Sequence, residues 1–163
     1  MRIRPAEEIP FEDDEGGGDD LDAVVALVAA LATPGAGWLN LLPEVDPELE
    51  PPPRGVLAAI FSARGPAVPL ATVTAPESPG GALTVGLEHG AGPKALDRLE
   101  ERGRPRPDGW RKLADHPRRG LVLAVPASTD PAELLRWLLD AARLLSPVPL
   151  TGSWLARAYR PGR

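Results

Sequence analysis

The chain has 163 residues, 43% of them hydrophobic, and no cysteine. This length is typical of one domain with a single core. The lack of cysteine excludes disulfides, thiolate nucleophiles and cysteine-ligated metals. No apolar segment reaches the ~20 residues that a membrane-spanning helix needs, and the N-terminal residues do not have the pattern of a signal peptide. We therefore predict a soluble cytoplasmic protein without a membrane partner.

Charge is distributed unevenly along the chain. Residues 1–50 carry 13 acids and two bases, a net charge of −11, whereas residues 51–163 carry 10 acids and 16 bases, a net charge of +6. Residues 1–18 contain too few apolar side chains to offset the entropy of ordering, so we expect a disordered acidic tail. Such a tail could screen a basic surface or only keep the chain soluble. Residues 19–163 are expected to form a single α+β domain.

The clearest secondary-structure signals lie in residues 120–147. Residues 121–125 are a continuous apolar run, which is typical of a strand covered on both faces. Asp130, Pro131 and Glu133 have the spacing of a capped helix start, which predicts a helix to residue 145. Its polar residues form one narrow stripe, so Leu138 and most of its neighbours should face the core. A helix of this kind predicts a layered structure of helices on a sheet.

The other elements are predicted from apolar periodicity, proline and glycine. Helices are expected at residues 19–32 and 94–102, strands at 56–62, 67–74, 82–87, 110–114 and 153–159, a short strand or ordered loop at 37–42, and a proline-rich connector at 43–53. The predicted fold is α+β, with an antiparallel sheet of five to six strands flanked by helices. The expected order is α-β-β-β-α-β-β-α-β.

A first candidate ligand site is the glycine-rich turn at residues 86–94. It places His89, Gly90, Gly92 and Lys94 between a strand and a helix N-terminus, where free N–H groups and the helix dipole favour anions. The turn departs from the phosphate-binding P-loop, because Pro93 precedes the lysine and Ala95 stands where a Ser or Thr would hold magnesium. The alternative is that the glycines only turn the chain.

A second candidate is the basic segment around His116, Arg118 and Arg119. Arginine suits bidentate contacts with phosphate or carboxylate. Acids are interspersed here, and only Trp110 is available for base stacking, so a nucleic-acid partner is not expected. The alternative is a solvated hairpin turn. The chain has only two histidines and lacks the HxH and HExxH spacings, so we expect no metal and no cofactor.

Several segments resemble small actinobacterial proteins of uncharacterised function. These segments are residues 38–53, 62–66, 115–123 and 146–152. The resemblance implies no activity. Separately, the order of elements is similar to the secretion-chaperone-like α+β fold, also found in YbjN-type proteins. That similarity implies a helix-flanked antiparallel sheet that binds another protein and often dimerises, although fold alone does not imply function.

We therefore predict a non-enzymatic protein-interaction or chaperone-like module that binds another protein or a second copy of itself. The alternative is a protein or enzyme that binds a small anionic molecule and uses His89 and His116. Binding of a specific metabolite without a protein partner would favour the alternative.

Overall fold

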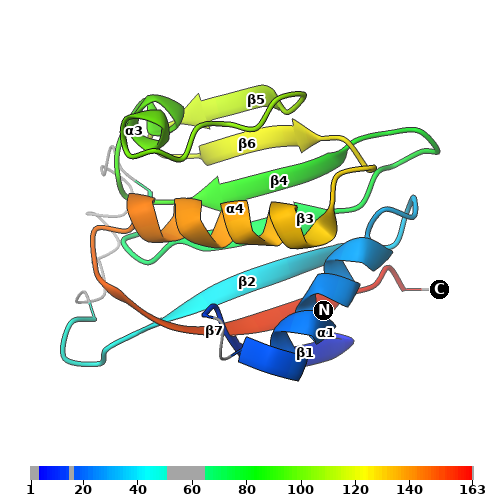
Figure 1. Ribbon diagram of the computed structural model, residues 1–163, viewed down its shortest axis with the longest axis horizontal. Helices are drawn as coiled ribbons and strands as arrows, with labels where there is room; N and C mark the ends of the chain where they lie inside the picture. Colours follow the sequence, from blue (N-terminus) through cyan, green and yellow to red (C-terminus); the bar gives the residue numbers. More distant parts are fainter. Residues whose placement is uncertain (1–3, 15–16, 51–64, 163) are drawn as a thin grey trace.

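The computed structural model describes residues 4–14, 17–50 and 65–162. The elements in these ranges are β1 (Glu7–Glu12), α1 (Gly18–Ala30), β2 (Trp38–Val45), β3 (Leu70–Thr74), β4 (Leu83–Glu88), α3 (Ala95–Glu101), β5 (Arg111–His116), β6 (Gly120–Val125), α4 (Pro131–Leu145) and β7 (Leu150–Tyr159). The strands form one seven-stranded sheet in the order β1-β7-β2-β3-β4-β6-β5, and every neighbouring pair is antiparallel (Figure 1). The α+β class and the antiparallel sheet are thereby confirmed.

The predicted number and order of strands are wrong, because a strand precedes the first helix. β1 lies inside the segment that we expected to be a disordered tail, and it pairs with β7 along its whole length. Phe11 is only 3% exposed and stacks on Trp154, with 6.4 Å between the ring centroids. The low average hydrophobicity of the segment hid an alternating pattern, in which Ile9 and Phe11 share one face.

Other boundaries differ by a few residues. Residues 37–42, a strand or a loop by sequence, belong to the longer strand β2, so the expected connector at 43–53 begins inside a strand. The pairing of β2 with β7 shifts register between Pro43 and Val45, which fits proline at an irregular position in a sheet. The strand expected at residues 56–62 lies outside the described residues.

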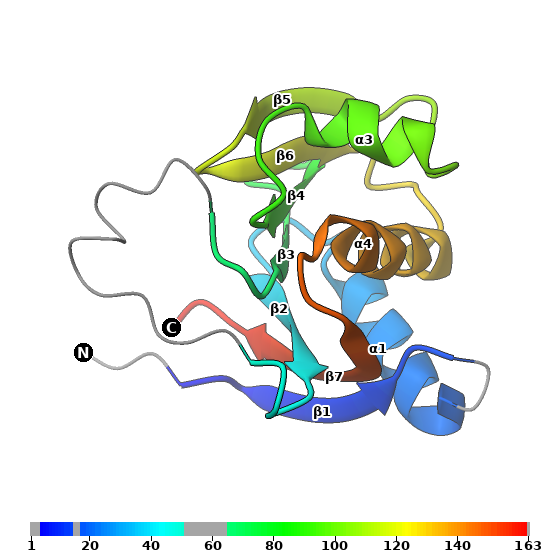
Figure 2. The same cartoon turned by 90° about the vertical axis from the view of Figure 1, so that its left-hand side faces the viewer.

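The helices α1, α3 and α4 lie on one face of the sheet, which we call the inner face (Figure 2). Alternate strand residues point to this face and are buried against the helices. Helix α4 begins as predicted, with the Asp130 side chain accepting a 2.8 Å hydrogen bond from the Ala132 N–H and with Pro131 in the first turn. Leu138 is completely buried, as the stripe pattern predicted.

None of the helices in the described ranges is long and apolar enough to cross a membrane. The opposite face of the sheet, the outer face, is covered by no described helix (Figure 2). It carries the alternate set of strand side chains, many of them half-buried. This difference between the two faces sets where a site can lie.

Candidate functional site

The first predicted site is a packed junction between β4 and α3. His89 is fully buried, and its Nδ1 accepts a 3.2 Å hydrogen bond from the Ala91 N–H. A side chain at Gly90 would lie 2.9 Å from the Pro66 carbonyl oxygen, so glycine is needed for a close approach of backbones. Gly92 has a φ of +90°, a conformation that favours glycine. His89, Gly90 and Gly92 therefore shape the turn.

Burial lowers the pKa of His89 below its usual value of 6.5. The nearby Asp115 carboxylate opposes this effect, and the Arg98 guanidinium adds to it. His89 Nε2 is also buried and has no hydrogen-bond partner. A histidine in this environment is neutral at neutral pH, so it does not supply positive charge for an anion.

The N–H groups that were expected to bind an anion are already satisfied by the protein. Asp115 Oδ1 accepts a 3.0 Å hydrogen bond from the Ala95 N–H, and Asp115 Oδ2 accepts one of 3.1 Å from the Leu96 N–H. A carboxylate from β5 thus caps the start of α3 and complements its dipole. Lys94 precedes this helix with a φ of +60° and is exposed. The predicted anion cradle is therefore filled by a side chain of the chain itself.

The second predicted site is the turn between β5 and β6. His116 Nδ1 accepts hydrogen bonds from the Arg118 N–H at 3.1 Å and the Arg119 N–H at 3.2 Å. All three side chains are exposed. Both histidines thus accept backbone hydrogen bonds through Nδ1, and each organises its own turn. In the described ranges, no group of three or more His, Asp and Glu side chains is placed to hold a metal.

A polar hollow of about 570 Å³ lies between α3 and β5. Both lysines of the chain, Lys94 and Lys112, line it together with Arg106. The acids Asp97, Glu100 and Asp115 also line it. Three formal positive charges therefore face three negative ones, so the hollow does not select an anion by its net charge.

The acidic N-terminal strand does not screen the basic segment at residues 111–119. β1 and β5 are the two opposite edges of the sheet (Figure 2). Beyond β1, the Asp13 carboxylate accepts a 2.9 Å hydrogen bond from Trp154 Nε1 and forms an ion pair with Arg143. These contacts hold residues 7–13 on β7 and α4, at the far side of the fold from β5.

The outer face of the sheet has a layered pattern that follows from the strand register. One row crosses all seven strands and is mostly polar; it consists of Glu8, Arg157, Asn40, Thr72, Gly86, Val122 and Ala114. Within it Glu8 pairs with Arg157 at 3.0 Å, and Thr72 Oγ1 donates a 2.9 Å hydrogen bond to Asn40 Oδ1. On one side of this row, Trp38 stacks on Tyr159 with centroids 5.0 Å apart.

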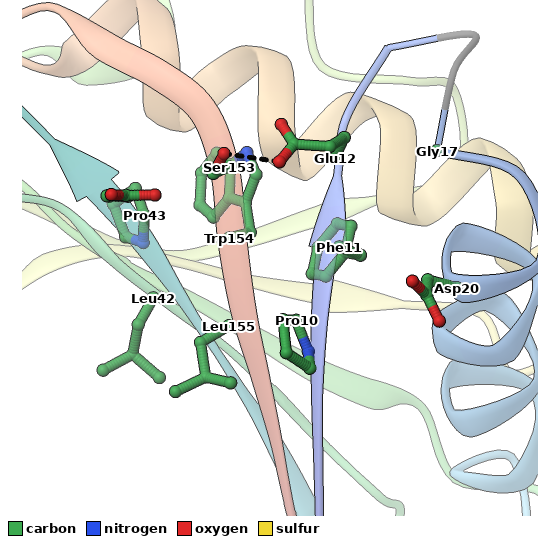
Figure 3. A pocket seen from close by; sticks show the side chains of 11 residues that line it. Pro10, Phe11, Glu12, Gly17, Asp20, Leu42, Pro43, Ser153, Trp154 and Leu155 are labelled. Carbon is green, nitrogen blue, oxygen red and sulfur yellow. Dashed lines mark hydrogen bonds between the residues drawn. The ribbon is translucent and has the colours of Figure 1, made fainter.

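On the other side of the polar row lies a hollow of about 620 Å³ across β1, β7 and β2 (Figure 3). Pro10, Leu155 and Leu42 are cross-strand neighbours and form an apolar row in it. Its acids are Glu12, Glu44 and Asp20, the last from α1, and no basic residue lines it. Ser153 Oγ donates a 2.6 Å hydrogen bond to Glu12 Oε1. We call this feature the acidic hollow.

Sequence reasoning missed the acidic hollow, because its three strands come from distant parts of the chain. The only local signal was the alternation of residues 7–12, in which Pro10 and Glu12 fall on the face opposite Phe11. Comparisons with protein-family models, with curated proteins and with solved structures found no match. The resemblances noted from the sequence therefore stay predictions.

Proposed function

We propose that this protein is a non-enzymatic protein-interaction domain that binds its partner on the outer face of the sheet. The partner contributes an apolar side chain flanked by basic residues, and this side chain enters the acidic hollow. The observation that carries the proposal is the composition of that hollow. It has an apolar row of Pro10, Leu155 and Leu42, and three acids with no base beside them.

Two physical arguments support a partner of this chemistry. The hollow has a volume within the usual range of ligand pockets, roughly 300–1,000 Å³, and its apolar row offers area that a partner side chain can bury. Its acids disfavour an acidic partner and attract a basic one, because electrostatic complementarity selects partners and speeds their encounter. Exposed apolar side chains grouped beside polar ones are typical of interaction surfaces.

The alternative function, an anion-binding protein or enzyme that uses His89 and His116, has less support. The two histidines accept hydrogen bonds within their own turns. The Ala95 and Leu96 N–H groups are bound to Asp115. Neither turn therefore offers a converging set of free donors.

The proposal can be tested with three short synthetic peptides that carry a central leucine flanked by arginine, by serine or by glutamate. Each is titrated into ¹⁵N-labelled protein while amide chemical shifts are followed. We expect the arginine-flanked peptide to bind most tightly and to shift the amides of Leu42 and Leu155. The glutamate-flanked peptide should bind most weakly, because the three acids repel it.

Substitutions then localise the binding. Leu155→Asp should abolish binding of the arginine-flanked peptide, and Glu12→Lys with Glu44→Lys should remove its advantage over the glutamate-flanked one. Thr84→Asp is the matched control, since Thr84 is an exposed outer-face residue of β4, away from the hollow. Equal binding of all three peptides, no measurable binding, or unchanged binding by Leu155→Asp would each overturn the proposal.

A further inference from the structure

Two large apolar side chains are strongly exposed among the described residues. Leu49 is 51% exposed and Leu113 is 50% exposed. Their neighbours differ in charge, since Leu49 lies between Glu48 and Glu50, whereas Leu113 directly follows Arg111 and Lys112. Only Leu113 therefore has the basic flank that complements the acidic hollow.

The position of Leu113 makes it available to another molecule. It belongs to β5, the edge strand at the opposite side of the sheet from β1. The register of β5 with β6 shifts between Lys112 and Ala114, and this shift leaves Leu113 without a partner in the ladder. A bulge and charged residues on an edge strand hinder edge-to-edge pairing. The exposed leucine is therefore suited to a side-chain contact and not to an added strand.

On the basis of the proposed function, we infer that a second copy of this chain is a partner of the acidic hollow. Leu113 of one copy enters the hollow of the other, and Arg111 and Lys112 lie against Glu12 and Glu44. The contact buries two apolar surfaces, Leu113 and the row in the hollow, that are otherwise in contact with water. It also brings opposite charges together at its rim.

The topology allows this contact to close into a symmetric dimer. The hollow and Leu113 lie at opposite edges of one sheet, roughly 29 Å apart at about 4.8 Å per strand. When two outer faces stack around a two-fold axis parallel to the strands, β5 of each copy lies over β1 of the other. Both contacts then form at once, which is the isologous arrangement that limits assembly to two copies.

Sedimentation equilibrium of the full chain, over a range of protein concentrations, measures this association. We expect a monomer–dimer equilibrium that weakens as salt is added, because the rim charges are screened within about 10 Å at 0.1 M ionic strength. Leu113→Asp should raise the dissociation constant about thirtyfold or more, as expected for the loss of a central apolar anchor. The matched control is Leu49→Asp, which should leave the dissociation constant unchanged.

A charge exchange identifies the two surfaces directly. One variant carries Glu12→Lys and Glu44→Lys, and the other carries Arg111→Glu and Lys112→Glu. Alone, each variant should associate at least about tenfold more weakly than the parent chain, because like charges then meet at both contacts. Mixed together, the two variants should form a heterodimer, since both contacts regain opposite charges. The control Glu77→Lys with Glu101→Lys reverses two exposed acids outside the hollow and should not alter association.

The outcomes separate this inference from the proposed function. A chain that stays monomeric, or that associates equally well in all variants, overturns the inference. If the arginine-flanked peptide still binds the hollow of such a chain, the proposed function holds with another partner. A peptide of residues 108–117 provides a further check, since it should bind the hollow, whereas a peptide of residues 44–50 with its acidic flanks should not.

Discussion

The inner and outer faces of the sheet are built from the same strands, yet they are organised by different forces. On the inner face, Phe11 and Leu41 are buried against the helices, and shape and apolar area decide which residues fit. On the outer face, Pro10 and Leu42 come directly beside them in sequence but form part of an acidic hollow. Side chains one residue apart on a strand can therefore serve stability and binding separately.

The largest expected difference between the faces is at β1. Phe11→Ala should lower the free energy of unfolding by about 3–5 kcal/mol, because it leaves a cavity between β1, β7 and the helices. Pro10→Ala, on the outer face of the same strand, should change it by less than about 0.5 kcal/mol. Urea denaturation followed by tryptophan fluorescence measures both. A small effect of Phe11→Ala would mean that β1 is not part of the core.

The second prediction concerns the carboxylate that links β5 to α3 on the inner side. Asp115→Ala should cost about 0.5–2 kcal/mol, the usual range for loss of a helix cap. Amide exchange of Ala95 and Leu96 should become faster, because both N–H groups lose their acceptor. Asp97→Ala is the control, since Asp97 is exposed on the same helix. Unchanged exchange at residues 95 and 96 would rule out the cap.

The third prediction is a pH dependence caused by His89. Its pKa in the folded protein lies below 6.5, so the unfolded chain takes up the proton first as the pH falls. The stability that neutral His89 contributes is therefore complete above about pH 6.5 and is lost as the pH decreases toward the lower pKa of the folded state.

Melting temperatures between pH 7.5 and pH 5 test this effect. His89→Gln should flatten the profile in that range, whereas His116→Gln should keep it, because His116 is exposed and His89 is buried. Asp115→Asn should steepen the loss, since removing the negative charge lowers the pKa of His89 further. Parallel profiles for the parent chain and His89→Gln would show that other groups cause the pH dependence.

The smallest expected effect is at the outer-face ion pair of Glu8 and Arg157. Both side chains are partly exposed, at 46% and 38%, so the pair should contribute only about 0.2–1 kcal/mol. A double-mutant cycle with Glu8→Ala and Arg157→Ala, measured by urea denaturation, gives the coupling energy. A coupling much above this range would mean that the outer face also stabilises the fold strongly.

Prediction from sequence succeeded where the signal was local. The cap at Asp130, the apolar run of β6 and the buried stripe of α4 were visible within a few residues, because periodicity and capping depend on near neighbours. It failed at β1, where composition indicated disorder. The strand is stable there because Phe11 packs on Trp154, a residue 143 positions further along the chain.

The same reasoning applies to the candidate sites. Sequence identified the turns at His89 and His116, but not that Asp115 supplies the cap of α3 from a strand 20 residues away. It also showed the basic flank of Leu113 without showing that Leu113 lies on an edge strand.

Sequence by itself determined the class of the fold, the position of α4 and the charge of each segment, since these depend on residue type and local spacing. Only the tertiary structure decided that β1 and β5 are opposite edges and that Pro10, Leu155 and Leu42 share one hollow. The physical reason is that strand pairing joins residues far apart in the chain, and its register follows from the packing of the whole inner face.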